Sequence, residues 1–248
     1  MEHHLIKQDF FKTEIKTETG FSLVELLIVF TIISIMSGAA LFFLAGNKKL
    51  YQADDEALKI VDIMQEARQR SLTQRETMRV EIDLTSNMVR LIDENTVTTA
   101  NDDTVVRSVA LADQGSVSVS TRPSEITDNP PEPFPVPTMQ FKLSSYPTSN
   151  AHNVATIRFQ SNGMIVDAGN NPTGAGAISV GATVHVWSKK DAESDSLLVA
   201  RAITVIGSTG SVRLWEYNPG LQGNSKWQDS RRTGSYGGQQ TGNPTPTP

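Results

Sequence analysis

The stretch of sequence that decides the fold is residues 21–44, FSLVELLIVFTIISIMSGAALFFL. It holds 24 residues and a single charge, Glu25. A helix of this length spans roughly 36 Å, enough to cross a bilayer core of about 30 Å. The stretch therefore predicts a membrane-spanning helix. An acid inside such a span is expected to have a function, since burying its charge costs about 2.5–3.5 kcal/mol.

The residues around the start of this stretch carry a family resemblance. The segment GFSLVELL, residues 20–27, resembles the processing site of type IV pilins and of the pseudopilins of type II secretion. The resemblance implies that residues 1–20 are a leader cut off after Gly20 by a prepilin peptidase. It also implies that the new N-terminus, Phe21, is methylated and that Glu25 helps dock each subunit into a helical filament. The alternative is an ordinary signal anchor, in which an acid so near the start of the span is rare.

The leader and the composition narrow the class of protein. Residues 1–20 are polar and have no apolar segment before the cut, unlike a conventional secretory signal. The net charge of −5 gives no bulk attraction to nucleic acid, and the absence of cysteine excludes disulfides and thiol chemistry. The resemblance implies a single-pass inner-membrane protein with a cytoplasmic leader and a periplasmic domain, which later enters a pilus or pseudopilus.

The helix is expected to continue to about Thr73. Apolar and small residues recur there at three- and four-residue spacing, which marks one face of an amphipathic helix. They are Leu50, Ala53, Ala57, Ile60, Val61, Met64, Ala67 and Ser71. This face is interpreted as core against a sheet. Pilins often carry a proline near the end of the span, but no proline lies between Phe21 and Pro123, so that kink is not expected.

A run of strand signals follows the helix. Glu76–Leu84 alternates apolar and charged residues, which predicts a half-buried strand, and Thr85-Ser86-Asn87 is typical of a hairpin turn. The further candidates are Met88–Ile92, Val105–Leu111, Ser116–Thr121, Met139–Leu143, Val154–Phe159, Met164–Val166, Thr183–Ser188, Leu197–Val205 and Ser211–Tyr217. Turn signals lie at Ser161-Asn162-Gly163 and Gly207-Ser208-Thr209-Gly210.

The predicted fold class is therefore α+β and pilin-like. The predicted order is the leader 1–20, the membrane or filament-core helix 21–45, the amphipathic helix 46–74 and an antiparallel β domain 75–217. The composition of residues 218–248 predicts a disordered tail.

Two stretches interrupt the β domain. Pro123–Pro137 contains six prolines and predicts a long extended surface loop, because proline cannot donate to a sheet. Residues 168–177, rich in Gly and Asn, predict a flexible loop.

Parts of the β domain resemble the GspH/FimT branch of minor pilins and pseudopilins. The segment Ala67–Arg75, leading into the first strand, is similar to the start of that branch. The segment Ile157–Gly163 is similar to its Phe-x-x-x-Gly hairpin, and Arg201–Leu214 is similar to its last hairpin.

No enzyme motif stands out in the chain. It has neither a P-loop nor His-Glu-x-x-His, and no nucleophile-elbow Gly-x-Ser-x-Gly, although a Ser-His-Asp arrangement stays open at this stage. His152 and His185 are interpreted as structural or solvated. Asp102-Asp103 and the group Asp191, Glu193 and Asp195 are interpreted as solvated acids, with calcium as a weaker alternative. No enzymatic activity, cofactor or metal is expected.

DNA binding is the alternative function. Some FimT-like minor pilins bind DNA through a Gly-Arg-x-Arg element near the last hairpin. The matching positions here are Gly210-Ser211-Val212-Arg213, in which serine replaces the first arginine. Contacts from Arg213, and from Arg231 and Arg232 in the tail, are then expected to be weak. Trp227 and Tyr236 could add stacking.

The leading hypothesis is a structural minor pilin or minor pseudopilin. Its implied partners are other subunits, the prepilin peptidase, the inner-membrane assembly platform and, before assembly, membrane lipid. The sequence leaves open which machine it belongs to, whether the subunit lies at the tip or along the shaft, and what the proline-rich loop and the tail do.

Overall fold

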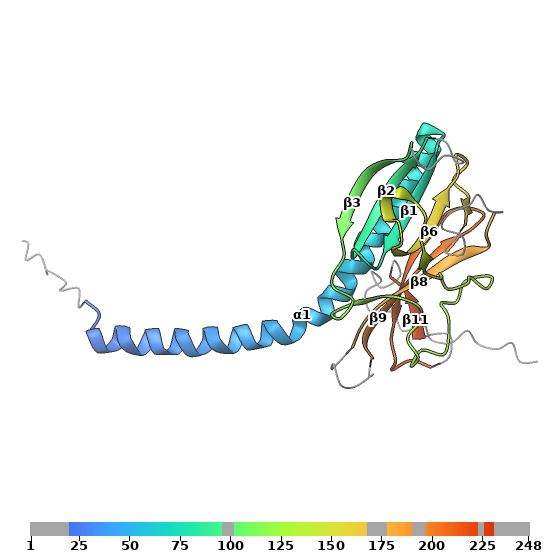
Figure 1. The fold of residues 1–248 in the computed structure, drawn as a ribbon. Coiled ribbons are helices and arrows are strands. Elements are labelled where there is room, and N and C mark those ends of the chain that lie inside the picture. Colours follow the sequence, from blue (N-terminus) through green and yellow to red (C-terminus); the bar gives the residue numbers. More distant parts are fainter. Residues whose placement is uncertain (1–19, 96–101, 168–177, 190–196, 223–225, 231–248) are drawn as a thin grey trace, which may run out of the picture. The chain divides into compact units, whose positions relative to one another are not determined.

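The fold of the 248-residue chain was obtained as a computed structural model (Figure 1). It describes residues 20–95, 102–167, 178–189, 197–222 and 226–230, with the side chains of residues 42–50 and 197–198 left out. The chain divides into two units, Met1–Gly46 and Asn47–Pro248.

Helix α1 is the first element and runs from Leu23 to Gln74. In its second half, the predicted apolar face is buried at seven of its eight positions, and the side chain of the eighth, Leu50, lies outside the described ones. The seven are Ala53, Ala57, Ile60, Val61, Met64, Ala67 and Ser71. The helix ends where Arg75 takes a left-handed φ of 60°, which turns the chain into the first strand. The predicted end at about Thr73 is correct to within one residue.

Sheet A packs against the buried face of α1. It consists of β1 (Thr77–Asp83), β2 (Met88–Glu94), β3 (Thr104–Ala110), β5 (Lys142–Leu143), β6 (Asn153–Phe159) and β7 (Ile165–Val166). The strand order is β3-β2-β1-β6-β5, and β7 also pairs with β6. All pairs are antiparallel. A short 3-10 helix, η1 (Pro147–Ser149), connects β5 to β6.

Sheet B is built mainly from the last third of the chain. It consists of β4 (Ser118–Ser120), β8 (Gly181–Lys189), β9 (Leu197–Ile206), β10 (Val212–Tyr217) and β11 (Trp227–Asp229). The order is β11-β10-β9-β8-β4, again antiparallel.

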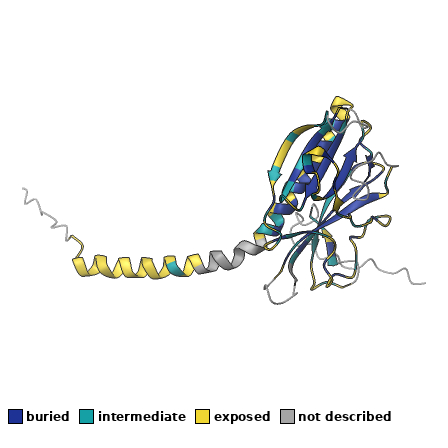
Figure 2. Ribbon diagram, in the orientation of Figure 1, coloured by how far each residue is buried: buried dark blue, intermediate teal, exposed yellow. Residues whose placement is uncertain are grey.

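The second half of α1 and both sheets share one hydrophobic core. Ile60 and Met64 of α1, Val80 of β1 and Val184 and Ile203 of sheet B belong to the same buried cluster. Figure 2 shows the strands largely in the buried colour. The predicted α+β class, with a helix on antiparallel strands, is confirmed. The division of the strands into two sheets was not predicted.

Two hairpin turns meet the C-terminal end of α1. Gly163 and Gly210 have positive φ of 77° and 59°, which L side chains rarely adopt. A Cβ on Gly163 would lie 3.0 Å from Leu72, and one on Gly210 would lie 2.1 Å from the carbonyl oxygen of Gly163. Arg68 donates to the carbonyl of Thr209 at 2.9 Å. The two hairpins that resemble the GspH/FimT branch therefore contact each other and the helix.

The proline-rich stretch is more than a surface loop. It has no regular helix or strand, but Ile126 and Val136 are buried, and the Thr183 amide of β8 donates to the Pro137 carbonyl at 2.7 Å. Glu132 contacts Thr204, Arg213 and Trp215 of sheet B. The segment is not extended throughout, since hydrogen bonds from Ile126 to Pro123 and from Glu132 to Pro130 close turns in it, and it contacts this sheet.

The predicted disorder of the tail is wrong for its first part. Strand β11 lies within residues 218–248, and Trp227 is buried. Its indole donates to the carbonyl of Asp128 at 2.8 Å. Its ring belongs to a buried apolar cluster with Ile126 and Trp215, and this burial stabilises the strand. The rest of the tail from residue 231, and the predicted loop at 168–177, lie outside the described residues.

Candidate functional site

The peptide bond between Gly20 and Phe21 precedes α1. A Cβ added to Gly20 would meet no atom within 4 Å, and the residue does not have a positive φ. The fold of this chain therefore does not demand glycine at position 20. Phe21 is 83 % exposed. Both sides of the bond are open to a protease, and a requirement for glycine would come from the protease's own pocket.

The first half of α1 displays an apolar surface on all sides. Leu23–Leu41 is 19 residues long with a mean hydropathy of 2.2, and none of it is buried within the chain. Phe30, Ile35 and Met36 are each more than 60 % exposed. A helix that is apolar all round needs lipid or other protein around it, because water makes such exposure unfavourable. By length and composition it can cross a membrane.

Two hydroxyl groups in this half bond to carbonyls of the helix itself. The hydroxyl of Thr31 donates to the carbonyls of Leu27 and Ile28, and that of Ser34 donates to the carbonyl of Phe30. Glu25, in the first turn, is the only ionisable side chain of residues 20–41. It has no hydrogen-bond or ion-pair partner among the described residues. A carboxylate without a partner in an apolar surface calls for a cation from outside the chain.

Of the residues named for DNA contact, the described ranges include Arg213 and Trp227. Arg213 on β10 is bound by Glu132, with Nη1 2.9 Å from Oε2, and Glu132 is almost fully buried. Trp227 is 3 % exposed and packs against Tyr217 and His185, so its predicted role in stacking on bases is wrong. Arg231, Arg232 and Tyr236 lie outside the described residues. Contact of Arg213 with DNA stays a prediction.

The outer face of sheet A holds charges that sequence reasoning placed in solvent. Strand β1 was predicted to be half-buried, but Arg79, Glu81 and Asp83 are all buried. Arg79 on β1 lies directly opposite Arg158 on β6, and Glu94 of β2 bonds to both guanidinium groups. The side chain of Glu94 is 2 % exposed. The alternation of apolar and charged residues along β1 was predicted correctly. This local pattern does not indicate which other segments bury the charged face of the sheet.

The segment between β5 and β6 provides part of that cover. The ring of Tyr146, just before η1, lies over the Arg79 guanidinium, with 3.6 Å between ring centroid and Cζ. Asp103, considered above for calcium, ion-pairs with Arg79 at 2.9 Å. Burial raises the pKa of the Asp103 carboxyl, although Arg79 partly opposes this. Asp103 thus forms an ion pair with Arg79.

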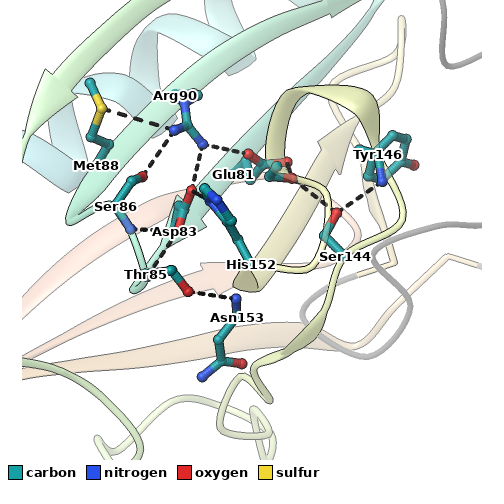
Figure 3. A network of polar contacts seen from close by, with 11 residues as sticks. Glu81, Asp83, Thr85, Ser86, Met88, Arg90, Ser144, Tyr146, His152 and Asn153 are labelled. Carbon is teal, nitrogen blue, oxygen red and sulfur yellow. Dashed lines mark hydrogen bonds and ion pairs between the residues drawn. The ribbon is translucent and has the colours of Figure 1, made fainter.

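A second buried network joins the β1–β2 turn to η1 (Figure 3). Arg90 Nη1 lies 2.9 Å from Glu81 Oε1 and 2.8 Å from Asp83 Oδ2. His152 Nδ1 lies 2.6 Å from the same Asp83 oxygen. Burial by itself raises the pKa of Asp83, but hydrogen bonds from His152, Ser86 and Arg90 outweigh it and hold the pKa well below its usual range.

This network contains two members of a catalytic triad but not the third. The Ser149 hydroxyl donates to Glu81 at 2.8 Å, so it is directed away from the His152–Asp83 pair. Within the described residues, no serine hydroxyl is hydrogen-bonded to His152. Asp83 accepts from the amides of Thr85 and Ser86, which places the network in turn formation. Some of its members, such as Asp83 and His152, lie more than 60 residues apart in the sequence, so no local motif marks the network.

The remaining histidine and the acids offer no metal centre in the part of the chain described. His185 on β8 is fully buried, and burial, with a contribution from Arg122, lowers its pKa to about 4. Neither ring nitrogen has a partner there. No group of three or more His, Asp or Glu side chains within the described ranges could hold a metal ion. Asp191, Glu193 and Asp195 are outside them.

Comparison with known proteins places the N-terminal helix in a family context. Residues 15–41 match the family model described as the prokaryotic N-terminal methylation motif, a prepilin signal of the type IV pilin kind. No curated protein and no solved structure matches the chain. The matched range includes Gly20, Phe21 and Glu25 and the exposed apolar half of α1. The chain thus carries the signal of pilin-like proteins that are processed by a prepilin peptidase and interact with other subunits.

Proposed function

We propose that the chain is a structural, non-enzymatic minor pilin or minor pseudopilin of a type IV pilus or a type II secretion machine. One observation carries the proposal: the methylation motif lies on an apolar, exposed helix whose one acid, Glu25, has no partner among the described residues. Such a helix suits lipid before assembly and the core of a filament afterwards.

Processing prepares the helix for assembly. In the proposed mechanism, the prepilin peptidase cuts after Gly20 and leaves Phe21 with a free amino group, which is then methylated. The cation at Phe21 of one subunit then pairs with Glu25 of its neighbour. This pairing compensates the charge of both groups where water is excluded, and it fixes the register between subunits.

The β domain supports membership of the GspH/FimT branch. Its two resembling hairpins lie against each other at the end of α1, where both Gly163 and Gly210 have positive φ and the Gly163 carbonyl approaches Gly210 closely. In this proposal the domain is displayed on the extracytoplasmic side, and it reaches the filament through an inner-membrane assembly platform.

The test separates processing from docking. Gly20→Ala should leave precursor that still carries residues 1–20, as measured by mass spectrometry of the N-terminus. Glu25→Ala should be cut and methylated normally but fail to enter filaments, because the neighbour's cation loses its partner. The matched control is Glu216→Ala, which removes an acid of the same type from β10. Normal filament incorporation of Glu25→Ala would show that the docking role is wrong.

A further inference from the structure

The outer face of sheet B carries a group of aromatic side chains that the shared core does not explain. Val184 and Val186 of β8 belong to that core. Side chains alternate along a strand, so His185 and Trp187 point to the opposite side of the sheet. The group is called the aromatic face below and consists of His185 and Trp187 of β8, Trp215 and Tyr217 of β10 and Trp227 of β11. It includes all three tryptophans of the chain.

Small side chains lie between the rings of β8 and β10. The strand register places Ala202 of β9 directly between His185 and Trp215. Ala200, on the same side of β9, lies opposite Trp187. Neighbouring strands are about 4.8 Å apart, so β8 and β10 are separated by roughly 10 Å. An alanine side chain does not fill that width, which leaves room for a ring above β9.

The indole of Trp227 enters this space from the edge of the sheet. Strand β11 is separated from β8 by β10 and β9, yet the ring centroids of Trp227 and His185 are 6.0 Å apart. The indole also packs on Tyr217, at 5.1 Å between centroids, and donates to the Asp128 carbonyl. Only three residue pairs join β11 to β10. A short edge strand of this kind opens locally at a lower free-energy cost than the central strands.

Trp227 packs against the apolar surface of this face but leaves its polar groups unmatched. Both ring nitrogens of His185 and Nε1 of Trp187 are buried and have no hydrogen-bond partner among the described residues. His185 is 0 % exposed, so water does not replace the missing partners at its surface. By contrast, Trp215 Nε1 donates to the Thr204 hydroxyl at 2.9 Å. Buried polar groups without partners are unfavourable, so a ligand that bonds to these nitrogens gains what the indole of Trp227 does not.

The unmatched groups identify the class of ligand. A neutral imidazole offers one donor and one acceptor, and an indole offers one donor. A sugar ring suits this set, because its hydroxyls both donate and accept while its C–H faces pack on aromatic rings. Ser118 and Ser120 of β4, opposite Trp187 and His185, add two hydroxyls beside them. We propose that the aromatic face is a binding site for a neutral sugar unit and that Trp227 is a cap that the sugar displaces. This site does not depend on the role of the chain in a filament.

The experiment screens the full chain in detergent on an array of neutral oligosaccharides and titrates the glycan that binds best. Trp227→Ala should bind it about tenfold more tightly than wild type, because no cap has to be displaced. Trp187→Phe keeps a ring but removes Nε1, so it should bind about tenfold more weakly. Tyr51→Phe is the matched control, since it removes one polar group from an aromatic residue that is 70 % exposed on α1. It should bind as wild type does.

Hydrogen exchange of the wild-type protein keeps the inference testable if Trp227→Ala folds poorly. With saturating glycan, the amides of Trp227–Asp229 should exchange at least tenfold faster, whereas those of β9 should not. Absence of saturable binding to the array by folded wild type, or equal affinities of wild type and Trp187→Phe, would overturn the sugar site. Binding with unchanged exchange in β11 would overturn the role of Trp227 as a cap.

Discussion

Charge is treated in opposite ways in the first half of α1 and on the outer face of sheet A. Residues 20–41 have one ionisable side chain, Glu25, with no partner among the described residues. Sheet A buries Arg79 and Arg158 completely and binds both to Glu94 of the same chain. Burial of a charge is tolerated only when it is paired. The helix thus depends on other molecules to pair its charge, whereas sheet A pairs these buried charges within the chain.

The largest expected effect comes from breaking the buried ion-pair network of sheet A. Glu94→Ala removes the carboxylate shared by Arg79 and Arg158, both of which stay buried. Breaking a buried pair from one side costs about 3–5 kcal/mol. The free energy of unfolding from urea titrations at neutral pH should fall by that amount.

The control for this prediction is a surface ion pair of the same residue type. Glu66→Ala removes contacts to Arg70 and Arg107, which are 37 % and 42 % exposed, and should cost less than about 1 kcal/mol. Equal losses in the two variants would mean that the network on sheet A is not the buried, mutually dependent cluster described above.

A pH effect of intermediate size follows from His185. Its pKa is lowered by burial to about 4, below the value of about 6.5 in an unfolded chain. The unfolded state therefore binds a proton first as the pH falls. Stability is fully present above pH 6.5, decreases as the pH falls towards 4, and the loss amounts to roughly 3 kcal/mol.

The measurement compares wild type with His185→Asn in urea titrations at pH 7 and pH 4.5. All other titratable groups are shared by the two proteins, so the difference between their pH dependences isolates His185. Wild type should lose more stability than the variant between the two pH values. Parallel losses would show that His185 is not the group responsible.

Local pattern predicted most of this molecule. The three- and four-residue spacing of α1 and the two-residue alternation of β1 depend on nearby residues, and both elements form where expected. The turns at Asn87 and Gly163, which need positive φ, were likewise visible from residue type. Gly20, Phe21 and Glu25 lie close together in the sequence and within the residues, 15–41, that match the family model, so they too were visible from local sequence.

The errors concern contacts between distant residues. Whether Arg79 is buried depends on Tyr146, 67 positions later, and the strand at Trp227–Asp229 is fixed by the contact from Trp227 to Asp128 and by pairing with β10. Neither has a local signal. The separation of the strands into two sheets also has no local signal, because β4 follows β1, β2 and β3 of sheet A in the sequence but pairs with β8 of sheet B.

The smallest expected effect tests whether the hydroxyl of Thr31, like the carboxylate of Glu25, makes a polar contact with a neighbouring subunit. Thr31→Val replaces a hydroxyl that bonds to the carbonyls of its own helix, so membrane insertion and assembly should change by less than about twofold. Thr31→Lys is the contrasting variant and should impair insertion, measured as resistance to alkaline extraction. If Thr31→Val reduces assembly as strongly as Glu25→Ala, the hydroxyl must bond to a neighbour in the filament. The helix would then have two polar contacts with its neighbours, and the contrast with sheet A would no longer depend on a single charge.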